Sequence, residues 1–246
     1  YVLLEMGQPL HAFDYDRLRE NRIVVKRAEE GEIFSTLDGQ SHALDREILM
    51  ICDGERSVAV AGIMGGLNSE IFAGSTNVLV ESAYFDPITI RRGSKKLGLS
   101  TEASYRFERG IDIEGVITAL RRALMLIHQL AGGQVIKGLI DNYPKPFSPR
   151  VIEMRIDKTN DFLGTTLSQE TIAGYLKALE LHVETEEPNL IRVIPPPYRV
   201  DLTREVDLME EVARLEGYDK ILVTSPHIRP SDEGDLPELG LGEKVR

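Results

Sequence analysis

The chain has 246 residues, of which 42% are hydrophobic and 28% charged, and this composition is typical of a globular protein. No run approaches the ~20 apolar residues that span a bilayer. A single cysteine, Cys52, excludes an internal disulfide framework and a cysteine-based zinc site. We therefore expect a cytoplasmic protein with no membrane partner. Because the first residue is Tyr1 rather than methionine, we also expect a piece of a longer protein.

The charge is distributed unevenly along the chain. Its 29 basic and 40 acidic residues give a net charge of −11. Residues 1–150 hold 18 basic and 20 acidic side chains, so the remainder holds 11 and 20 and carries most of the excess. This contrast predicts two units, and the acidic total argues against a general nucleic-acid binder.

One stretch, residues 91–122, reverses this trend with eight basic and only four acidic side chains, a local charge of +4. Such a surface can meet a phosphate backbone, whereas charge alone favours the alternative of an ordinary solvated surface. The basic residues are Arg91, Arg92, Lys95, Lys96, Arg106, Arg109, Arg121 and Arg122.

Residues 1 to about 150 have the pattern of strands and loops that end in one helix. Helical spacing of apolar residues predicts that this helix starts at its N-cap, Asp112, and ends near Ala131. We expect a further strand at 134–140 and a proline-rich linker at 143–149. Apolar runs predict the other strands at 23–28, 48–52, 58–63 and 77–85, with a hairpin turn at Asp38-Gly39.

The second unit is predicted to be a small winged-helix-like α+β unit. Ser168 is expected to cap a helix, and Gly217 to follow the end of another. The predicted elements are a strand at 151–156, a helix that buries Ile172, Leu176 and Leu179, a hairpin of 182–186 and 191–194 around Pro188-Asn189, and a helix at 203–216 with Val206, Met209 and Val212 facing the core.

Four features of the first unit could carry chemistry, although none is decisive alone. His11 could hold water or carry a proton, but a lone histidine is more often structural. Gly62 and Gly65 could admit a ligand to backbone N–H groups, but a plain tight turn is the simpler interpretation. Glu81 either forms a strand-end salt bridge or recognises a substrate hydroxyl, because burying it unpaired is costly. The segment 99–110 has the pattern of a polar loop entering a helix.

The second unit contains a set of carboxylates with regular spacing. Asp207, Glu210 and Glu211 lie at helical positions i, i+3 and i+4 and therefore share a face, and Asp201 precedes them. Oxygen ligands of this kind suit Mg²⁺. The alternative is a solvated acidic helix start that the helix dipole favours, and the spacing alone does not separate the two.

Together these motifs resemble the beta subunit of bacterial phenylalanine–tRNA ligase (phenylalanyl-tRNA synthetase). Five motifs in chain order cover residues 1 to about 223, so the resemblance is far more specific than any single motif. They are Gly7-Gln8-Pro9-Leu10-His11-Ala12-Phe13-Asp14, Gly62-Ile63-Met64-Gly65-Gly66, Glu81-Ser82-Ala83-Tyr84-Phe85-Asp86-Pro87, Thr101-Glu102-Ala103-Ser104-Tyr105-Arg106-Phe107-Glu108-Arg109-Gly110, and Tyr198-Arg199-Val200-Asp201 with the acidic helix that follows.

The resemblance implies an α+β protein in three parts: a mixed-sheet tRNA-editing domain at 1–148, a winged-helix-like domain at 149–223, and a linker or tail at 224–246. In that family the editing domain hydrolyses tyrosine wrongly attached to tRNA(Phe). Carried over by position, the catalytic residues are His11, Glu81 and Thr101, the substrate-binding residues are Gly62, Gly65, Glu81 and Ala103, and the metal ligands are Asp201, Asp207, Glu210 and Glu211.

The resemblance also implies cofactors and partners. Mg²⁺ would be shared with the alpha subunit, ATP would be used only by the whole enzyme, and the assembly would be an alpha2beta2 heterotetramer that binds tRNA(Phe). Glu81 would accept the phenolic O–H that distinguishes tyrosine from phenylalanine. The basic stretch 91–122 could guide the 3′ end of the tRNA.

Two other functions stay open. The chain could be a non-catalytic scaffold that docks the alpha subunit and tRNA. It could also be a Mg²⁺-dependent phosphoryl-transfer enzyme, which ranks last because no phosphate-binding glycine loop lies near the acidic set.

Overall fold

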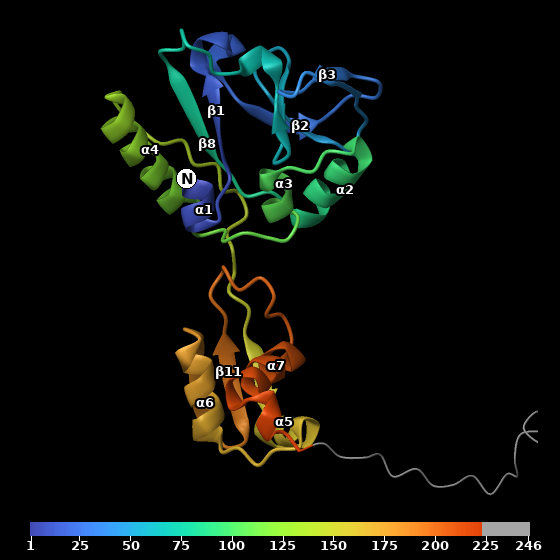
Figure 1. Ribbon diagram of the computed structural model, residues 1–246, viewed down its shortest axis with the longest axis vertical. Coiled ribbons are helices and arrows are strands. Elements are labelled where there is room, and N and C mark those ends of the chain that lie inside the picture. The colour runs from blue at the N-terminus through green and yellow to red at the C-terminus, as the bar shows by residue number, and fades with distance from the viewer. Residues whose placement is uncertain (223–246) are drawn as a thin grey trace, which may run out of the picture.

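The computed structural model describes residues 1–222, with only the backbone described at position 186. Figure 1 shows two bodies joined by an extended segment, an upper one formed by the first part of the chain and a lower one formed by residues after about 150. None of the described helices is long and apolar enough to cross a membrane. The predicted tail at 224–246 lies outside the described residues.

The described helices and strands alternate irregularly along the chain. The helices are α1 (Val2–Met6), α2 (Pro87–Leu97), α3 (Glu102–Phe107), α4 (Val116–Ala131), α5 (Ile156–Leu163), α6 (Gln169–Ala178) and α7 (Glu205–Glu216). The strands are β1 (Leu10–Asp14), β2 (Val24–Arg27), β3 (Ile33–Ser35), β4 (Ser41–Ala43), β5 (Leu49–Cys52), β6 (Ser57–Val60), β7 (Met64–Gly65), β8 (Val78–Ser82), β9 (Ile152–Arg155), β10 (His182–Glu187) and β11 (Leu190–Ile194).

Three small sheets form the first unit. β1 pairs with β8, β3 pairs with β4 around the turn at Asp38-Gly39, and a four-stranded sheet has the order β2-β5-β6-β7. Every residue of β6 is buried, which explains why its apolar run is continuous rather than alternating. One core cluster joins the sheets to α2 and α3, and it includes Phe13, Met50, Val58, Ile90 and Phe107.

The first unit has more helix than the sequence analysis predicted. α1, α2 and α3 were not expected. α2 buries Ile90, Gly93 and Ser94 on one face, and its basic side chains on the remaining surface are exposed. α4 starts at Val116, not at Asp112, because Asp112 instead accepts a hydrogen bond from the backbone N–H of Glu114 in the preceding turn, and Gly115 is the N-cap. α4 packs along β8 and covers it beside α1 (Figure 1).

The strand predicted at 134–140 is absent from the structure. This segment has no regular structure, and Ile136 and Ile140 are 84% and 98% exposed. A strand needs a pairing partner, and none of the described strands lies against this segment. The predicted linker at 143–149 likewise has no helix or strand and is exposed.

The second unit has a three-stranded sheet of order β10-β11-β9 with α5, α6 and α7 packed against it. Ser168 caps α6 as predicted, since its hydroxyl accepts from the backbone N–H of Thr171. The sequence analysis missed α5. It was also wrong to place Val206 in the core, because Val206 is 39% exposed and Leu208 is the fully buried residue. The core cluster of this unit draws on residues 152–212 alone.

The predicted α+β class is confirmed. All strand pairs within residues 1–222 are antiparallel, so the sheets of the first unit, expected to be mixed, contain no parallel pair there. The boundaries at 148/149 and 223/224 stay predictions. Gly110 of the first unit lies close to Val200 of the second. Its φ is +91°, and a Cβ added there would lie 3.2–3.3 Å from the Val200 side chain.

Candidate active site

The pairing of β1 with β8 brings together the two titratable residues that the sequence analysis singled out. His11 lies directly opposite Glu81 in the antiparallel register, so their side chains share one face of the ribbon. The side chain of Gln8, which is buried, donates from Nε2 to the carbonyl oxygen of Ala83 at 2.9 Å and fixes the end of this pair. The ribbon is thus held in a single register beside the core.

Glu81 is partly buried, and one oxygen of its carboxyl group is buried without a partner within residues 1–222. Its Oε2 has no hydrogen-bond donor among the described residues and is shielded from solvent. Burial raises the pKa of this carboxyl from 4.5 to about 7, because the charged form loses its hydration without a compensating cation. An unpaired buried acceptor destabilises the fold, which makes Glu81 a candidate for binding a ligand that supplies a donor.

The His11 side chain lies against the glycine segment 62–65. A Cβ at Gly65 would lie 2.4 Å from Cε1 and 2.7 Å from Nε2 of His11, so the absence of a side chain at Gly65 makes room for the imidazole. The ring of Phe13 meets the His11 ring edge-on at 4.5 Å between centroids. Burial lowers the pKa of His11 below its ordinary value, which favours the neutral imidazole, the form that can accept a proton.

Thr101 joins α3 to the same glycine segment. Its hydroxyl donates to the carbonyl oxygen of Ile63 at 2.8 Å and accepts from the backbone N–H of Ser104 at 3.0 Å, as the N-cap of α3. Because its one hydroxyl proton is committed to Ile63, Thr101 holds the wall of the site in place. The pattern Thr101-x-x-Ser104 is a capping box, a signal that predicts a helix start at this point.

Gly62 is a site where a larger side chain would not fit freely, and Ala103 belongs to the same core. Gly62 has φ +65°, and a Cβ there would lie 2.8 Å from Phe85 and 3.1 Å from Phe107. Ala103 packs, partly buried, against the same core cluster. The missing side chain at Gly62 therefore lets the backbone pack closely against the Phe85 and Phe107 rings, which meet edge-on at 5.0 Å between centroids.

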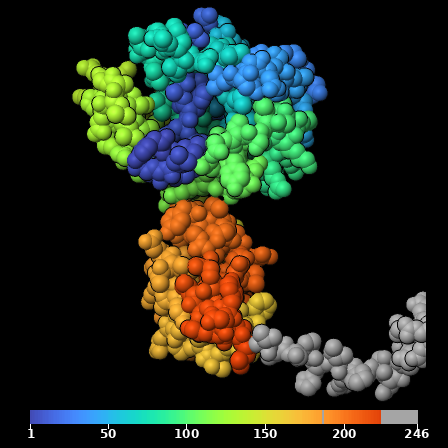
Figure 2. All heavy atoms as spheres, in the orientation of Figure 1, coloured from blue at the N-terminus to red at the C-terminus, as the bar shows by residue number. Residues whose placement is uncertain are grey.

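The structure thus brings His11 and Thr101 against one segment, 62–65, and places Glu81 opposite His11 on the neighbouring strand. Figure 2 shows a recess in the surface of this unit, bounded by the dark-blue N-terminal segment and by green and light-blue spheres of later residues. The sequence analysis missed Leu37, whose backbone N–H donates to the carbonyl oxygen of Gly65 at 3.0 Å and whose Cδ1 would lie 3.0 Å from a Gly65 Cβ. In the sequence, Leu37 is only the residue before the turn at Asp38-Gly39, and nothing in that local pattern predicts a contact with Gly65.

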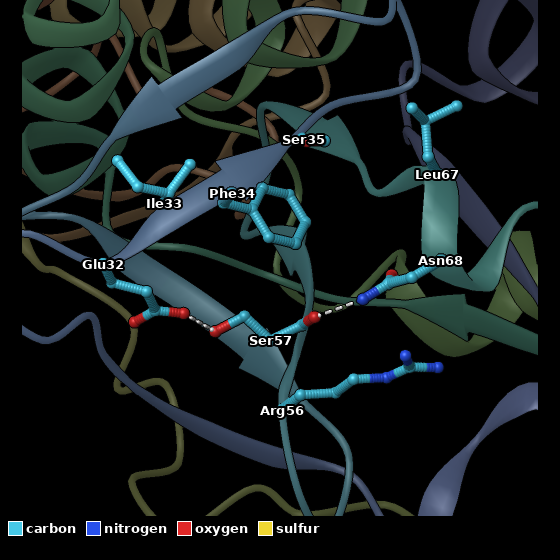
Figure 3. Close-up of a pocket in the computed structure, with 8 residues that line it drawn as sticks. All are labelled: Glu32, Ile33, Phe34, Ser35, Arg56, Ser57, Leu67 and Asn68. Carbon is cyan, nitrogen blue, oxygen red and sulfur yellow. Dashed lines mark hydrogen bonds between the residues drawn. The ribbon is translucent and has the colours of Figure 1, made fainter.

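A separate cleft of about 320 Å³ lies between β3 and the start of β6 (Figure 3). In it Ser57 donates to Glu32 at 2.5 Å, and Asn68 donates to the backbone oxygen of Ser57 at 2.8 Å. None of the residues predicted for the site lines this cleft.

The four acidic residues of the second unit do not gather into a metal site. Arg199 donates to Asp201 at 2.7 and 2.9 Å and to Glu211 at 2.8 Å, and its hydrogen bonds lower the pKa of Asp201. Asp207 accepts from the backbone N–H groups of Thr203 and Arg204 at the start of α7. Within residues 1–222, no group of three or more potential metal ligands is arranged to hold an ion.

This arrangement does not fit a metal ion as it stands. Arg199 compensates two of the four carboxylates, Asp201 and Glu211, and the sequence analysis did not anticipate this pairing. The Mg²⁺ site at Asp201, Asp207, Glu210 and Glu211 stays a prediction, and we derive no chemical step through it.

Comparison with known proteins finds one matching family model for each unit. A B3/4 domain family matches residues 1–132, and a tRNA synthetase B5 domain family matches residues 152–218. The Phenylalanine--tRNA ligase beta subunit of Geobacter sulfurreducens is 55% identical over 229 residues, which cover 93% of this chain and 29% of that protein. The protein of the same name from Moorella thermoacetica is 52% identical over 237 residues, 96% of this chain and 29% of that protein.

The chain thus spans about three tenths of the length of these relatives. Among solved structures, an N-terminal fragment of the phenylalanyl-tRNA synthetase beta subunit from Pyrococcus horikoshii is 17% identical, with a TM-score of 0.45 over 85% of this chain and 60% of that one. The family match over the first unit and the identity to the bacterial relatives confirm the resemblance found in the sequence. The chain therefore belongs to the B3/4 domain family and is a homologue, over its whole length, of phenylalanine--tRNA ligase beta subunits.

Proposed function

We propose that the first unit hydrolyses tyrosine that has been attached wrongly to tRNA(Phe). The observation that carries this proposal is the Oε2 atom of Glu81, which is buried, lacks a partner within residues 1–222, and lies opposite His11. Phenylalanine and tyrosine differ by one hydroxyl. A buried acceptor binds the molecule that supplies a donor and rejects the one that leaves the acceptor unpaired.

The reaction is hydrolysis of an ester. The oxygen of a water molecule bonds to the carbonyl carbon of the tyrosyl group, and the bond from that carbon to the ribose oxygen breaks. The ribose oxygen takes a proton, and tyrosine leaves as the free acid. Neutral His11 holds the water and accepts its proton, and orientation supplies much of the acceleration because an aminoacyl ester is already reactive.

The remaining residues shape the site. Gly65 leaves room for the imidazole of His11, Gly62 lets the backbone approach the Phe85 and Phe107 rings, and Ala103 is a small residue packed against the same core. Thr101 anchors α3 to Ile63 and so positions this wall. These residues determine the shape of the site, whereas Glu81 recognises the hydroxyl of the substrate.

For the longer protein, we propose that the chain is part of a beta subunit that assembles with an alpha subunit as an alpha2beta2 heterotetramer. That enzyme would charge tRNA(Phe) with phenylalanine at the expense of ATP, with the synthetic site and its ATP in the alpha subunit. The match of residues 152–218 to a tRNA synthetase B5 domain supports this assignment. The alternative is a scaffold without catalysis that docks the alpha subunit and tRNA.

The test is release of labelled tyrosine from Tyr-tRNA(Phe) by the full protein that contains this chain. Glu81→Ala should reduce the rate constant for release by about 10- to 100-fold, the effect of losing one hydrogen bond to a charged group. Glu114→Ala is the matched control, because Glu114 is exposed and lies outside the site. Release by Glu81→Ala at the wild-type rate would refute the role of this carboxyl, and no release by the wild type would favour the scaffold.

A further inference from the structure

The basic stretch 91–122 divides into paired and unpaired cations in the structure. Four of its eight basic side chains form ion pairs: Lys96 with Asp45 and Glu47, Arg106 with Glu102, Arg109 with Glu108, and Arg122 with Glu5. Within residues 1–222 the other four, Arg91, Arg92, Lys95 and Arg121, have no carboxylate within ion-pair distance.

Three of these unpaired cations lie on one helix. Arg91, Arg92 and Lys95 are exposed on α2, and Arg91 and Lys95 are four positions apart, which places them about 6 Å from each other along the helix axis. We call these three side chains the α2 cation patch. In a chain with a net charge of −11, an uncompensated group of this kind attracts a polyanion locally while the rest of the surface repels it.

The opposite face of α2 forms part of the wall behind the candidate site. Ile90 would lie 3.0 Å from a Cβ at Gly62, and Ile63 would lie 3.2 Å from a Cβ at Gly93. α2 also packs beside α3, and Figure 1 shows both at the outside of the first unit. The α2 cation patch is therefore separated from segment 62–65 by about one helix diameter, on the order of 10 Å.

We propose that the α2 cation patch binds the sugar–phosphate backbone of the RNA whose aminoacylated 3′ end enters the candidate site. The inference rests on the proposed function for the identity of that RNA. Cations at this spacing contact successive phosphates and read no sequence. The patch gives affinity and position, and Glu81 gives selection of the amino acid.

The test compares two variants that lose the same charge. Arg91→Ala/Arg92→Ala/Lys95→Ala removes the patch, and Lys26→Ala/Lys137→Ala/Lys177→Ala removes three exposed cations that form no ion pair with the described residues. Both are made in the full protein that contains this chain. A 5′-labelled tRNA(Phe) transcript is titrated by fluorescence anisotropy at several salt concentrations, and hydrolysis of tyrosine ethyl ester, which has no phosphate, is followed in parallel.

Loss of three phosphate contacts to single-stranded RNA should reduce the slope of log affinity against log salt by about 2. Raising the salt from about 50 mM to about 200 mM should therefore weaken wild-type binding about 15-fold more than binding by the patch variant. The control variant should follow the wild type, and ester hydrolysis should be the same in all three proteins.

A patch variant that binds tRNA with the wild-type slope overturns the inference. If the variant instead loses a protein partner, seen as a lower assembled mass with RNA binding unchanged, the patch is a protein-docking surface and the inference also fails. Because the titration uses uncharged RNA, it gives a result even if the wild type proves unable to release tyrosine, so the inference and the proposed function can fail separately.

Discussion

At the scale of single residues, the site depends on groups that reduce stability. Glu81 has a raised pKa and an unpaired oxygen, and Gly65 has no side chain where His11 needs space. Neither feature helps the chain to fold. Substitutions at these two positions should therefore separate folding from recognition, and each leads to a prediction with a definite sign.

Glu81→Gln should stabilise the fold, and more so at high pH. A group whose folded pKa lies above its unfolded value stabilises the fold only while protonated, so wild-type stability falls as pH rises from about 4.5 to about 7. The free energy of unfolding gained by the variant should grow by about 2 kcal/mol between about pH 5 and about pH 8. His11 titrates in both proteins, so its contribution cancels in the comparison.

Urea unfolding of both proteins at the two pH values measures this difference. The same variant should show a weaker preference for tyrosine over phenylalanine in a competition assay, because a neutral amide oxygen is a weaker acceptor than a carboxylate. In the wild type that preference should rise with pH through about 7, because the ionised carboxylate is the stronger acceptor. A gain in stability that is equal at both pH values would contradict the assignment of Glu81 as a buried titrating group.

Gly65→Ala should displace the His11 ring. The new methyl group would lie 2.4 Å from Cε1, so the ring must move, and overpacking of this kind costs about 1–3 kcal/mol of unfolding free energy. Adding His11→Ala should restore most of the stability but none of the tyrosine release. Gly133→Ala is the control, because a Cβ there meets nothing within 4 Å. Additive losses in the double variant would show that the two residues do not touch.

At the scale of elements, the position of α3 depends on one hydroxyl. Thr101→Ala removes the N-cap and leaves the Ile63 oxygen without its donor, so we expect a loss of about 1–2 kcal/mol and slower tyrosine release, with Thr101→Ser retaining both. Ser168→Ala removes the equivalent cap of α6 in the second unit. It should cost similar stability in thermal unfolding and leave tyrosine release unchanged; slowing by both variants alike would indicate a general effect of instability.

Some of these helices and strands could be predicted from the sequence and others could not. The hairpin β10–β11, the cap of α6 and the strands β5, β6 and β8 were predictable because their apolar runs and turn residues are local signals. α2 was missed because its mean polarity is high and only Ile90, Gly93 and Ser94 are buried. The segment 134–140 was misassigned because apolar residues suggest a strand even where no partner strand exists.

For the site, the motifs identified the residues but not their arrangement. That His11 faces Glu81 depends on the register of β1 and β8, which are far apart in the chain, and no local pattern determines such a pairing. The role of Thr101 as an anchor likewise follows from its contact with Ile63 in another element. Local sequence also could not show that Arg199 compensates both Asp201 and Glu211.

At the scale of the whole molecule, two separate cores predict two separate responses to mutation. Leu176 is fully buried in the second core, and Leu176→Ala should cost about 2–5 kcal/mol there. Hydrogen exchange should accelerate at amides within 152–212 and stay unchanged in β1 and β8. Met50→Ala, in the first core, should give the reverse pattern. Equal acceleration in both units would show that the chain unfolds as one cooperative body.

The pairing of β1 with β8 has a consequence for synthesis on the ribosome. Gln8 and Ala83, which close the ribbon, are 75 positions apart, and α3 adds its wall only later in the chain. A nascent polypeptide cannot complete the candidate site until the segment through α3 has left the exit tunnel, because every earlier intermediate lacks Thr101 and the wall that it anchors. Chains released prematurely before that point would be inert, whatever else they had folded.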